Sequence, residues 1–276
     1  MRRSRRRHPR RRAHASTQPR PAAPARRGAG AADMRCLVLP GLDGGGALLD
    51  DFLAAMRPRR EARALAYPGD PALGYAELID WVWPRLPADA PFALIGESFS
   101  GPVAVALAAR RPPQLKALVL CASFVRAPRP PWSPLGLAAL PSWTHRLPLQ
   151  RAPLAAVARA ALGRWSTAQR RQRLRAALDA LDPAVLRRRL GEIARVDARA
   201  ALAEVAVPTL YLRATADRLV SRESWEEIRR ARPRTDCIAL DAPHFVLQAR
   251  ADAAATRIGD WLDRASGLDA GRADVS

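Results

Sequence analysis

The sequence contains few cysteines, few aromatic residues and a single lysine, and it has no long hydrophobic run. Three cysteines in 276 residues are too few for a disulfide scaffold and are typical of a reducing compartment, so we expect a cytoplasmic protein. We expect Cys36, Cys121 and Cys237 to be buried thiols within apolar strands. No apolar run approaches the roughly 18 residues of a transmembrane helix, and no apolar h-region of a signal peptide follows the basic start.

Positive charge is concentrated in two segments. The formal net charge is +20, from 46 basic and 26 acidic residues. Residues 1–33 and residues 126–207 each carry a net charge of +10, whereas the rest of the chain is neutral. We therefore interpret the protein as a neutral body with two basic appendages.

The first appendage, residues 1–33, contains no Leu, Ile, Val or aromatic residue. It cannot bury enough apolar surface to offset its ordering entropy, so we expect a disordered tail. Electrostatic binding to nucleic acid or to an anionic membrane, and a targeting role, are alternatives. No aromatic residues are available to stack on bases, so we expect no specific nucleic-acid partner. An upstream extension before Met34 is the favoured interpretation.

From Met34 onward, short apolar strand patterns alternate with helical patterns. This order favours the α/β fold class, with a doubly wound, mainly parallel sheet of about six strands. The expected strands are Cys36–Leu39, Ala62–Ala66, Phe92–Ile95, Ala117–Cys121, Thr209–Arg213 and Cys237–Leu240. The expected helices are Ala47–Met56, Tyr75–Leu86, Val103–Arg110, Arg222–Ala231 and Phe245–Ala265.

Residues 126–207 are far longer than the dozen or so residues that a crossover between parallel strands needs. We predict a helical lid, inserted between the core segments 34–125 and 208–276, before the penultimate strand. Its first third is rich in proline and tryptophan, and we expect Trp132 and Trp143 to contact the substrate. Helices are expected at Pro153–Leu162, Ser166–Leu181 and Pro183–Val196.

A nucleophile pattern lies between a strand and a helix, in Gly96-Glu-Ser-Phe-Ser-Gly101. Small neighbours allow a serine at such a turn to adopt a strained backbone and to lift its hydroxyl clear of the sheet. Here the chain resembles the α/β-hydrolase fold family, whose pattern is G-x-S-x-G, and Ser98 takes the position of the nucleophile. The sequence departs from the pattern at Ser100, with Gly101 one position late.

The resemblance also points to a base and an acid. Of the four histidines, His8 and His14 lie in the tail, His145 lies in the lid, and only His244 lies in the neutral body. His244 follows the last strand, where the family places its histidine. Asp217 follows the penultimate strand, in a segment similar to the family's acid loop. Asp241 is the competing carboxylate, three residues before His244.

The oxyanion hole that the resemblance implies combines the backbone N–H groups of Phe99 and Leu42. Leu42 lies in Leu39-Pro-Gly-Leu-Asp-Gly-Gly-Gly46, which is similar to the family's His-Gly-x-Gly loop, with Pro40 in the place of the histidine. A phosphate-binding glycine loop is the alternative, but the Lys-Ser/Thr pair of a P-loop is missing.

The resemblance covers residues 34–276, starting at what is usually the third strand, so we expect two edge strands to be missing. It implies a serine hydrolase without a cofactor that cleaves a small-molecule ester or thioester through an acyl-enzyme. No His, Cys or carboxylate cluster has metal-ligand spacing, so no metal is expected. A serine nucleophile disfavours the haloalkane dehalogenase and epoxide hydrolase branches, which use aspartate.

The basic lid adds a possible partner. It favours substrates carried by an acidic partner such as acyl carrier protein, as in the carrier-protein methyl esterases that the chain partly resembles. The alternative function is a catalytically idle α/β-hydrolase scaffold that binds an acidic partner through its tail and lid.

Overall fold

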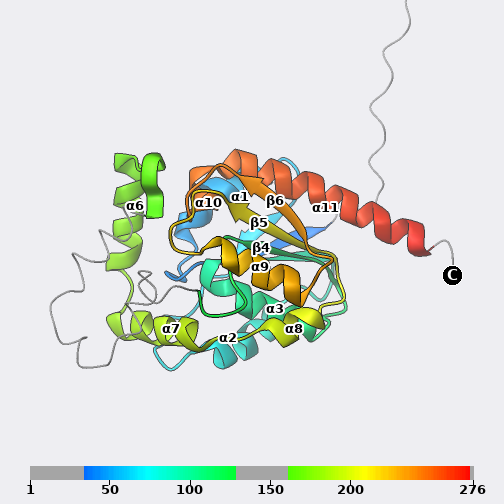
Figure 1. Cartoon of the computed structure of the whole chain (residues 1–276), viewed down its shortest axis with the longest axis horizontal. Coiled ribbons are helices and arrows are strands. Elements are labelled where there is room, and N and C mark those ends of the chain that lie inside the picture. Colours follow the sequence, from blue (N-terminus) through cyan, green and yellow to red (C-terminus); the bar gives the residue numbers. More distant parts are fainter. Residues whose placement is uncertain (1–33, 129–160, 274–276) are drawn as a thin grey trace, which may run out of the picture.

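The computed structural model describes residues 34–128 and 161–273. Six parallel strands form one sheet in the order β2-β1-β3-β4-β5-β6 (Figure 1). All six expected strands are present, and the doubly wound parallel sheet is confirmed. Their bounds are Arg35–Leu39 (β1), Ala62–Ala64 (β2), Phe92–Glu97 (β3), Leu115–Cys121 (β4), Thr209–Ala214 (β5) and Asp236–Leu240 (β6).

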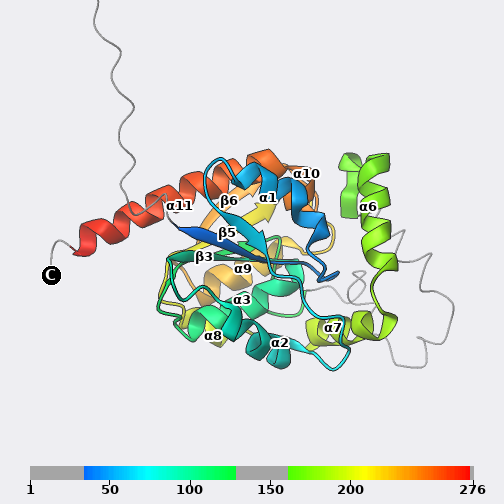
Figure 2. The same ribbon diagram turned by 180° about the vertical axis from the view of Figure 1, so that it is seen from behind.

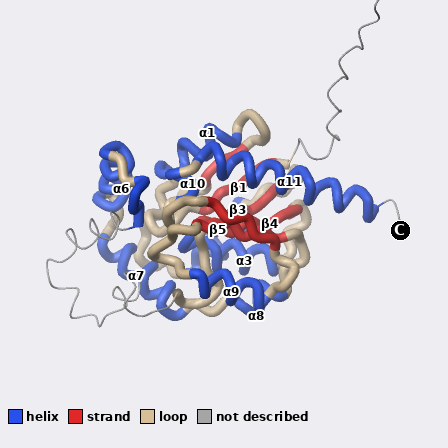
Figure 3. Tube along the Cα trace, turned by 45° about the horizontal axis from the view of Figure 1, so that its top comes forward, coloured by secondary structure: helices blue, strands red, loops and turns tan. Residues whose placement is uncertain are grey.

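Helices cover both faces of the sheet, which lies between two helical layers (Figures 1, 2 and 3). One layer contains α1 (Asp50–Met56), α10 (Val246–Ala249) and α11 (Ala251–Ala273). The other contains α2 (Tyr75–Val82), α3 (Gly101–Ala109), α8 (Arg199–Ala203) and α9 (Arg222–Ala231).

Successive strand residues point to opposite faces, and each face has its own hydrophobic core. Val38 and Ile95 belong to the core that includes Phe52 of α1, whereas Leu37 and Leu94 belong to the core on the side of α3. This two-sided burial explains why the central strands are apolar along nearly their whole length.

Several helix boundaries differ from the sequence expectations. The single helix expected at Phe245–Ala265 is two helices, α10 and α11, because Arg250 has a non-helical backbone with φ −134° and ψ 42°. The helix expected from Ala47 begins as a 3-10 turn, Ala47–Leu49. Helix α8 was not predicted, because its five residues, Arg-Ala-Ala-Leu-Ala, are too short to show a helical periodicity.

Edge strand β6 corrects the expectation for Cys237. Cys36 and Cys121 are buried, but Cys237 is exposed. Strand β6 pairs only with β5 among the described strands, and most of its residues are exposed or half-buried. An apolar strand pattern therefore does not guarantee burial when the strand lies at the edge of the sheet.

Residues 163–195, which lie between β4 and β5, contact loops at the carboxyl edge of the sheet. They contain a 3-10 turn (Gly163–Trp165), α6 (Ala168–Asp179) and α7 (Pro183–Arg195). Arg164 contacts Asp241 after β6, and Arg189 contacts Leu42 after β1. Figure 2 shows α6 and α7 together at the end of the molecule away from the C-terminal end of α11. The tail, Trp132, Trp143, His145 and most of the helix expected at Pro153–Leu162 lie outside the described residues.

The strand order puts the topological switch point of the sheet between β1 and β3. These strands are neighbours, but the chain leaves β1 for α1 on one face and leaves β3 for α3 on the other. In open α/β sheets, ligands bind outside the carboxyl ends of the strands at this kind of switch point. The loop after β1 and the turn after β3 carry Leu42 and Ser98.

Candidate functional site

Ser98 occupies a strained turn between β3 and α3. Its φ is 47°, in the left-handed region that residues with a Cβ rarely adopt. The Oγ of Ser123 donates a hydrogen bond to the Ser98 carbonyl at 2.6 Å, which helps to hold this conformation. Strain of this kind costs about 1–3 kcal/mol and concentrates at functional sites.

Two glycines make the turn possible. A Cβ at Gly96 would lie 2.8 Å from the Ser100 carbonyl oxygen and 2.9 Å from the Ala104 Cβ. A Cβ at Gly101 would collide with the side chain of Ser123. Gly101, one position later than the glycine of the usual motif, is therefore favoured because the Ser123 side chain leaves no room for a Cβ.

Ser100, where the motif usually has glycine, connects the turn to the loop after β1. Its hydroxyl donates to the Pro40 carbonyl, so the Tyr67 hydroxyl, whose oxygen lies 2.6 Å from Ser100 Oγ, acts as donor to it. Ser100, in place of the usual glycine, thus adds a hydrogen bond between the turn after β3 and the loop after β1, which meet at the switch point.

The other two tyrosines also support the turn. The Tyr75 hydroxyl donates to the Phe99 carbonyl at 3.0 Å, and its ring stacks on that of Phe99. The Tyr211 hydroxyl donates to the Ser123 carbonyl at 3.0 Å. Sequence reasoning missed these roles, because each tyrosine is far in sequence from the group that it contacts.

Ser98, His244 and Asp217, which were predicted from separate loops, lie in hydrogen-bond contact. Ser98 Oγ is 2.9 Å from His244 Nε2, and His244 Nδ1 is 2.8 Å from Asp217 Oδ2. The other carboxylate oxygen of Asp217 accepts from the N–H groups of Leu219 and Val220 at 2.8 and 2.9 Å. The side chains of His244 and Asp217 are only 6% and 5% exposed, so the contact between them is shielded from water.

Asp241, the competing carboxylate, lies elsewhere. It is exposed and forms an ion pair with Arg164 of the 3-10 turn before α6. Its proximity to His244 in sequence does not bring the two side chains into hydrogen-bond contact.

The pKa of His244 reflects opposing effects. Burial favours the neutral ring and lowers the pKa, but the charge of Asp217 and the hydrogen bond to it raise the pKa, and the charge of Glu97 adds to them. The net result is a raised pKa. The neutral imidazole, the form that can accept a proton, therefore forms at a higher pH than in a free histidine.

The backbone that carries the predicted oxyanion donors is held in place by packing and by hydrogen bonds. Phe99 directly follows Ser98 and is fully buried. In the loop after β1, the Gly44 N–H donates to the Gly41 carbonyl at 3.0 Å, and the Asp43 carboxylate accepts from the Gly45 N–H at 3.0 Å. The Leu42 carbonyl accepts from Arg189 of α7 at 2.8 Å.

Glu97 is a buried carboxyl that the sequence analysis overlooked. It directly precedes Ser98, is 5% exposed, and accepts a hydrogen bond from the Gln248 amide at 2.8 Å. Burial raises the pKa of Glu97 to about 7, with the charge of Asp43 acting in the same direction against the opposing effects of Gln248 and His244. The available signal was an acidic residue at the end of an otherwise apolar strand.

We expect Glu97→Gln to change how stability depends on pH. The pKa of Glu97 is raised in the folded protein, so its contribution to stability is complete below about pH 4.5 and is lost as the pH rises through about 7. A neutral glutamine avoids burying a charge and can still accept from Gln248. Relative to the parent protein, the variant should gain about 2–3 kcal/mol of unfolding free energy between pH 5 and pH 8, measured by urea denaturation.

Glu204→Gln is the matched control, since Glu204 is exposed and lies 3.8 Å from Arg111. The difference in unfolding free energy between Glu204→Gln and the parent protein should be nearly the same at pH 5 and at pH 8. An equally constant effect of Glu97→Gln would contradict a carboxyl that ionises near neutral pH in the folded protein.

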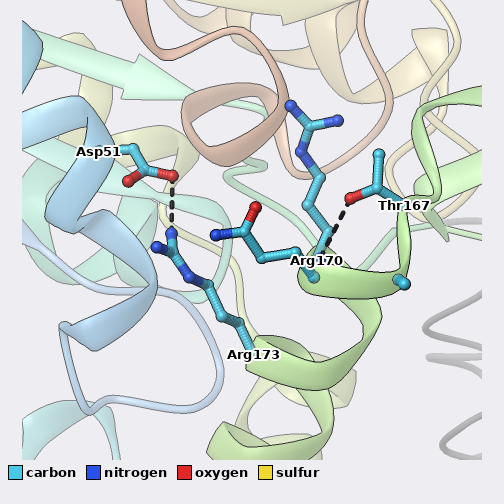
Figure 4. Close-up of a pocket in the computed structure, with 6 residues that line it drawn as sticks. Asp51, Thr167, Arg170 and Arg173 are labelled. Carbon is cyan, nitrogen blue, oxygen red and sulfur yellow. Dashed lines mark hydrogen bonds and ion pairs between the residues drawn. The ribbon is translucent and has the colours of Figure 1, made fainter.

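A cavity of about 360 Å³ lies between α1 and the first turn of α6. Figure 4 shows Arg173 of α6 pointing to Asp51 of α1, and the distance between Arg173 Nη1 and Asp51 Oδ2 is 2.7 Å. A smaller space of about 30 Å³ shares Arg170 and Arg173 and extends to Phe245 and Gln248. Phe245 directly follows His244 in the sequence, but neither space is lined by Ser98, His244 or Asp217.

Two absences apply to residues 34–128 and 161–273 alone. Within these ranges, no group of three or more His, Cys, Asp or Glu residues is arranged to hold a metal ion. None of the helices in these ranges is both long and apolar enough to cross a membrane.

Comparisons with solved structures find the same fold. An enol-lactonase from Burkholderia xenovorans LB400 is 22% identical, with a TM-score of 0.68 over 83% of this chain and 91% of that chain. A carboxylesterase structure from Nitrososphaera gargenis is 12% identical, with a TM-score of 0.68 over 86% and 92% of the two chains. A haloalkane dehalogenase loop variant from Bradyrhizobium elkanii is 19% identical, with a TM-score of 0.69 over 87% and 92%.

Sequence comparison identifies the family. No curated protein matches the chain. The family model Hydrolase_4, described as "Serine aminopeptidase, S33", matches residues 75–252, which include Ser98, Asp217 and His244. The match spans more than half of the sequence, and the parallel sheet agrees with it. The chain therefore belongs to this family of α/β hydrolases.

Proposed function

We propose that the protein is a serine hydrolase that cleaves a small-molecule carboxylic ester or thioester through an acyl-enzyme. The observation that carries the proposal is the continuous hydrogen-bonded contact from Ser98 through His244 to Asp217. Each side chain follows a different strand of the sheet, β3, β6 and β5, in the chain order that is typical of α/β hydrolases.

In this mechanism, Ser98 Oγ attacks the carbonyl carbon while His244 Nε2 takes its proton. The tetrahedral oxyanion accepts hydrogen bonds from the N–H groups of Phe99 and Leu42. His244 then donates the proton to the leaving alcohol or thiol, and the acyl group remains on Ser98. A water molecule, deprotonated by His244, releases the acid and restores Ser98. Asp217 holds the ring orientation and stabilises the imidazolium.

We further propose the division into core segments 34–125 and 208–276 and a lid, 126–207. Its described helices, α6 and α7, contact loops at the carboxyl edge of the sheet, which supports a place above the substrate. An acidic carrier protein as bearer of the acyl group stays a prediction from the charge of this segment.

The test uses p-nitrophenyl acetate and butyrate together with a fluorophosphonate probe. We expect hydrolysis of both esters, and labelling of Ser98 located by peptide mass spectrometry. L-Alanine and L-proline p-nitroanilides test amide cleavage, which the family description names; faster turnover of these than of the esters would overturn the ester assignment. An unlabelled protein that cleaves none of these substrates would favour the idle scaffold.

A further inference from the structure

Arg189 of α7 is a buried cation without a carboxylate partner. It is 2% exposed, and within the described residues no carboxylate lies at ion-pair distance from it. Its guanidinium donates to the Leu42 carbonyl at 2.8 Å and to the Pro68 carbonyl at 3.4 Å. The charge of Asp43, in the loop after β1, acts on Arg189 from beyond ion-pair distance. Because burying a charge without a direct ion pair is costly, the position calls for an explanation beyond general stability.

Three other arginines of residues 163–195 form ion pairs at the surface, whereas Arg170 donates to the backbone carbonyls of Trp165 and Ala249. Arg164 and Arg173 form ion pairs with Asp241 and Asp51, and Arg188 pairs with Glu77. The Arg189 guanidinium contacts only backbone carbonyls by hydrogen bonds among the described residues. Its carbon Cζ also lies 5.7 Å from the centre of the Tyr67 ring and 5.8 Å from that of Phe99, within the range of cation–π attraction.

The loop after β1 is shaped to receive this side chain. Gly44 has a φ of +69°, and a Cβ there would collide with the Arg189 guanidinium. The positive φ favours glycine at this position, and the missing side chain leaves the space that the Arg189 guanidinium fills. Arg189 therefore touches the loop that carries Leu42 and the ring of Phe99, the two residues assigned to the oxyanion hole.

We propose that Arg189 is a positioning residue that orients the Leu42 backbone and completes the oxyanion hole when α7 is seated. This inference rests on the proposed function. The Leu42 N–H belongs to the Gly41–Leu42 peptide, whose carbonyl accepts from the Gly44 N–H at 3.0 Å. Arg189 holds the next peptide through the Leu42 carbonyl, so the peptides on both sides of the Leu42 Cα are fixed and rotation about this residue is restricted.

The test compares Arg189→Met with Arg195→Met on p-nitrophenyl acetate. Arg195 lies on the same helix but is 69% exposed, so its replacement removes one charge without touching the loop. Losing one oxyanion donor costs about 10²–10³-fold in kcat, and misplacing one should cost less. We expect Arg189→Met to lower kcat by roughly 10- to 100-fold with KM within about threefold, and Arg195→Met to change neither. Rates are normalised to the fraction of protein that the fluorophosphonate probe labels.

A second measurement separates positioning from packing. A trifluoromethyl ketone forms a tetrahedral adduct with a serine nucleophile, and its affinity should fall in Arg189→Met by about the same factor as kcat/KM. Arg189→Lys, which keeps a donor and a charge, should recover part of both losses. If Arg189→Met does not fold, Arg189→Lys is compared with the parent protein instead, and a smaller loss in kcat and in ketone affinity is expected.

An unchanged kcat and ketone affinity in the folded Met variant, or in the Lys variant if only that one folds, would overturn the role of Arg189. Ser98→Ala is assayed in parallel. An inactive Ser98→Ala beside fully active Arg189 variants contradicts only the positioning role. Full activity of Ser98→Ala contradicts the proposed function itself.

Discussion

Ser98→Ala is expected to lower the rate of p-nitrophenyl acetate hydrolysis by roughly 10⁴- to 10⁶-fold, because it removes the atom that forms the acyl-enzyme. The fold should persist. Alanine meets the same backbone strain at φ 47°, and the Ser98 carbonyl keeps its hydrogen bond from Ser123. We expect the unfolding free energy to change by less than about 1 kcal/mol. Steady-state kinetics and urea denaturation provide both measurements.

Ser266→Ala is the matched control, since Ser266 lies on α11 and, among the described residues, its hydroxyl donates only to the Leu262 carbonyl. It should keep the full rate and the full labelling by a fluorophosphonate. Undiminished turnover in Ser98→Ala would remove Ser98 from the role of nucleophile.

Asp217→Asn should lower kcat by roughly 10³- to 10⁴-fold, by analogy with the triad aspartate of serine proteases. The reason is that the substitution changes which ring nitrogen of His244 carries the proton. The Asn side-chain oxygen can still accept from the Leu219 and Val220 N–H groups, which leaves its NH₂ group facing His244 Nδ1. A donor at that position favours the tautomer with the proton on Nε2. His244 then presents an N–H to Ser98 where a proton acceptor is needed.

The pH profile of Asp217→Asn gives a second readout. Asp217 raises the pKa of His244 through its charge and its hydrogen bond, against the effect of burial. Loss of that charge lowers the pKa, so the acid limb of kcat/KM should move to lower pH. Asp241→Asn, which breaks only an exposed ion pair with Arg164, should change kcat by less than about threefold. A larger effect at Asp241 than at Asp217 would show that the acid has been misassigned.

Much of the architecture could be predicted from local patterns. Strands buried on both faces appear as short apolar runs, and the helical patterns between them require parallel connections. A serine between a strand and a helix, flanked by small residues, indicates the nucleophile turn without any long-range information. His244 could be selected because it is the one histidine in the neutral body.

Other features depended on packing between distant residues. Asp217 and Asp241 both follow strands near His244, and only the tertiary structure places one at 2.8 Å and the other in an exposed ion pair. Cysteine is usually buried and glutamate is usually exposed, but here Cys237 is exposed and Glu97 is buried. The reason is position, since Cys237 lies on an edge strand and Glu97 lies in the interior of the sheet.

Arg189 illustrates the limit of sequence patterns most clearly. In sequence it is one of fifteen arginines in residues 126–207, where a solvated surface is the ordinary expectation. It is nevertheless buried against Leu42, which lies 147 residues earlier in the chain. The sequence by itself determined the order of strands and helices and the turn that holds Ser98, because these depend on near neighbours in the chain. Only the tertiary structure decided which charges are buried and what they contact, because burial is set by segments that the chain brings together from far apart.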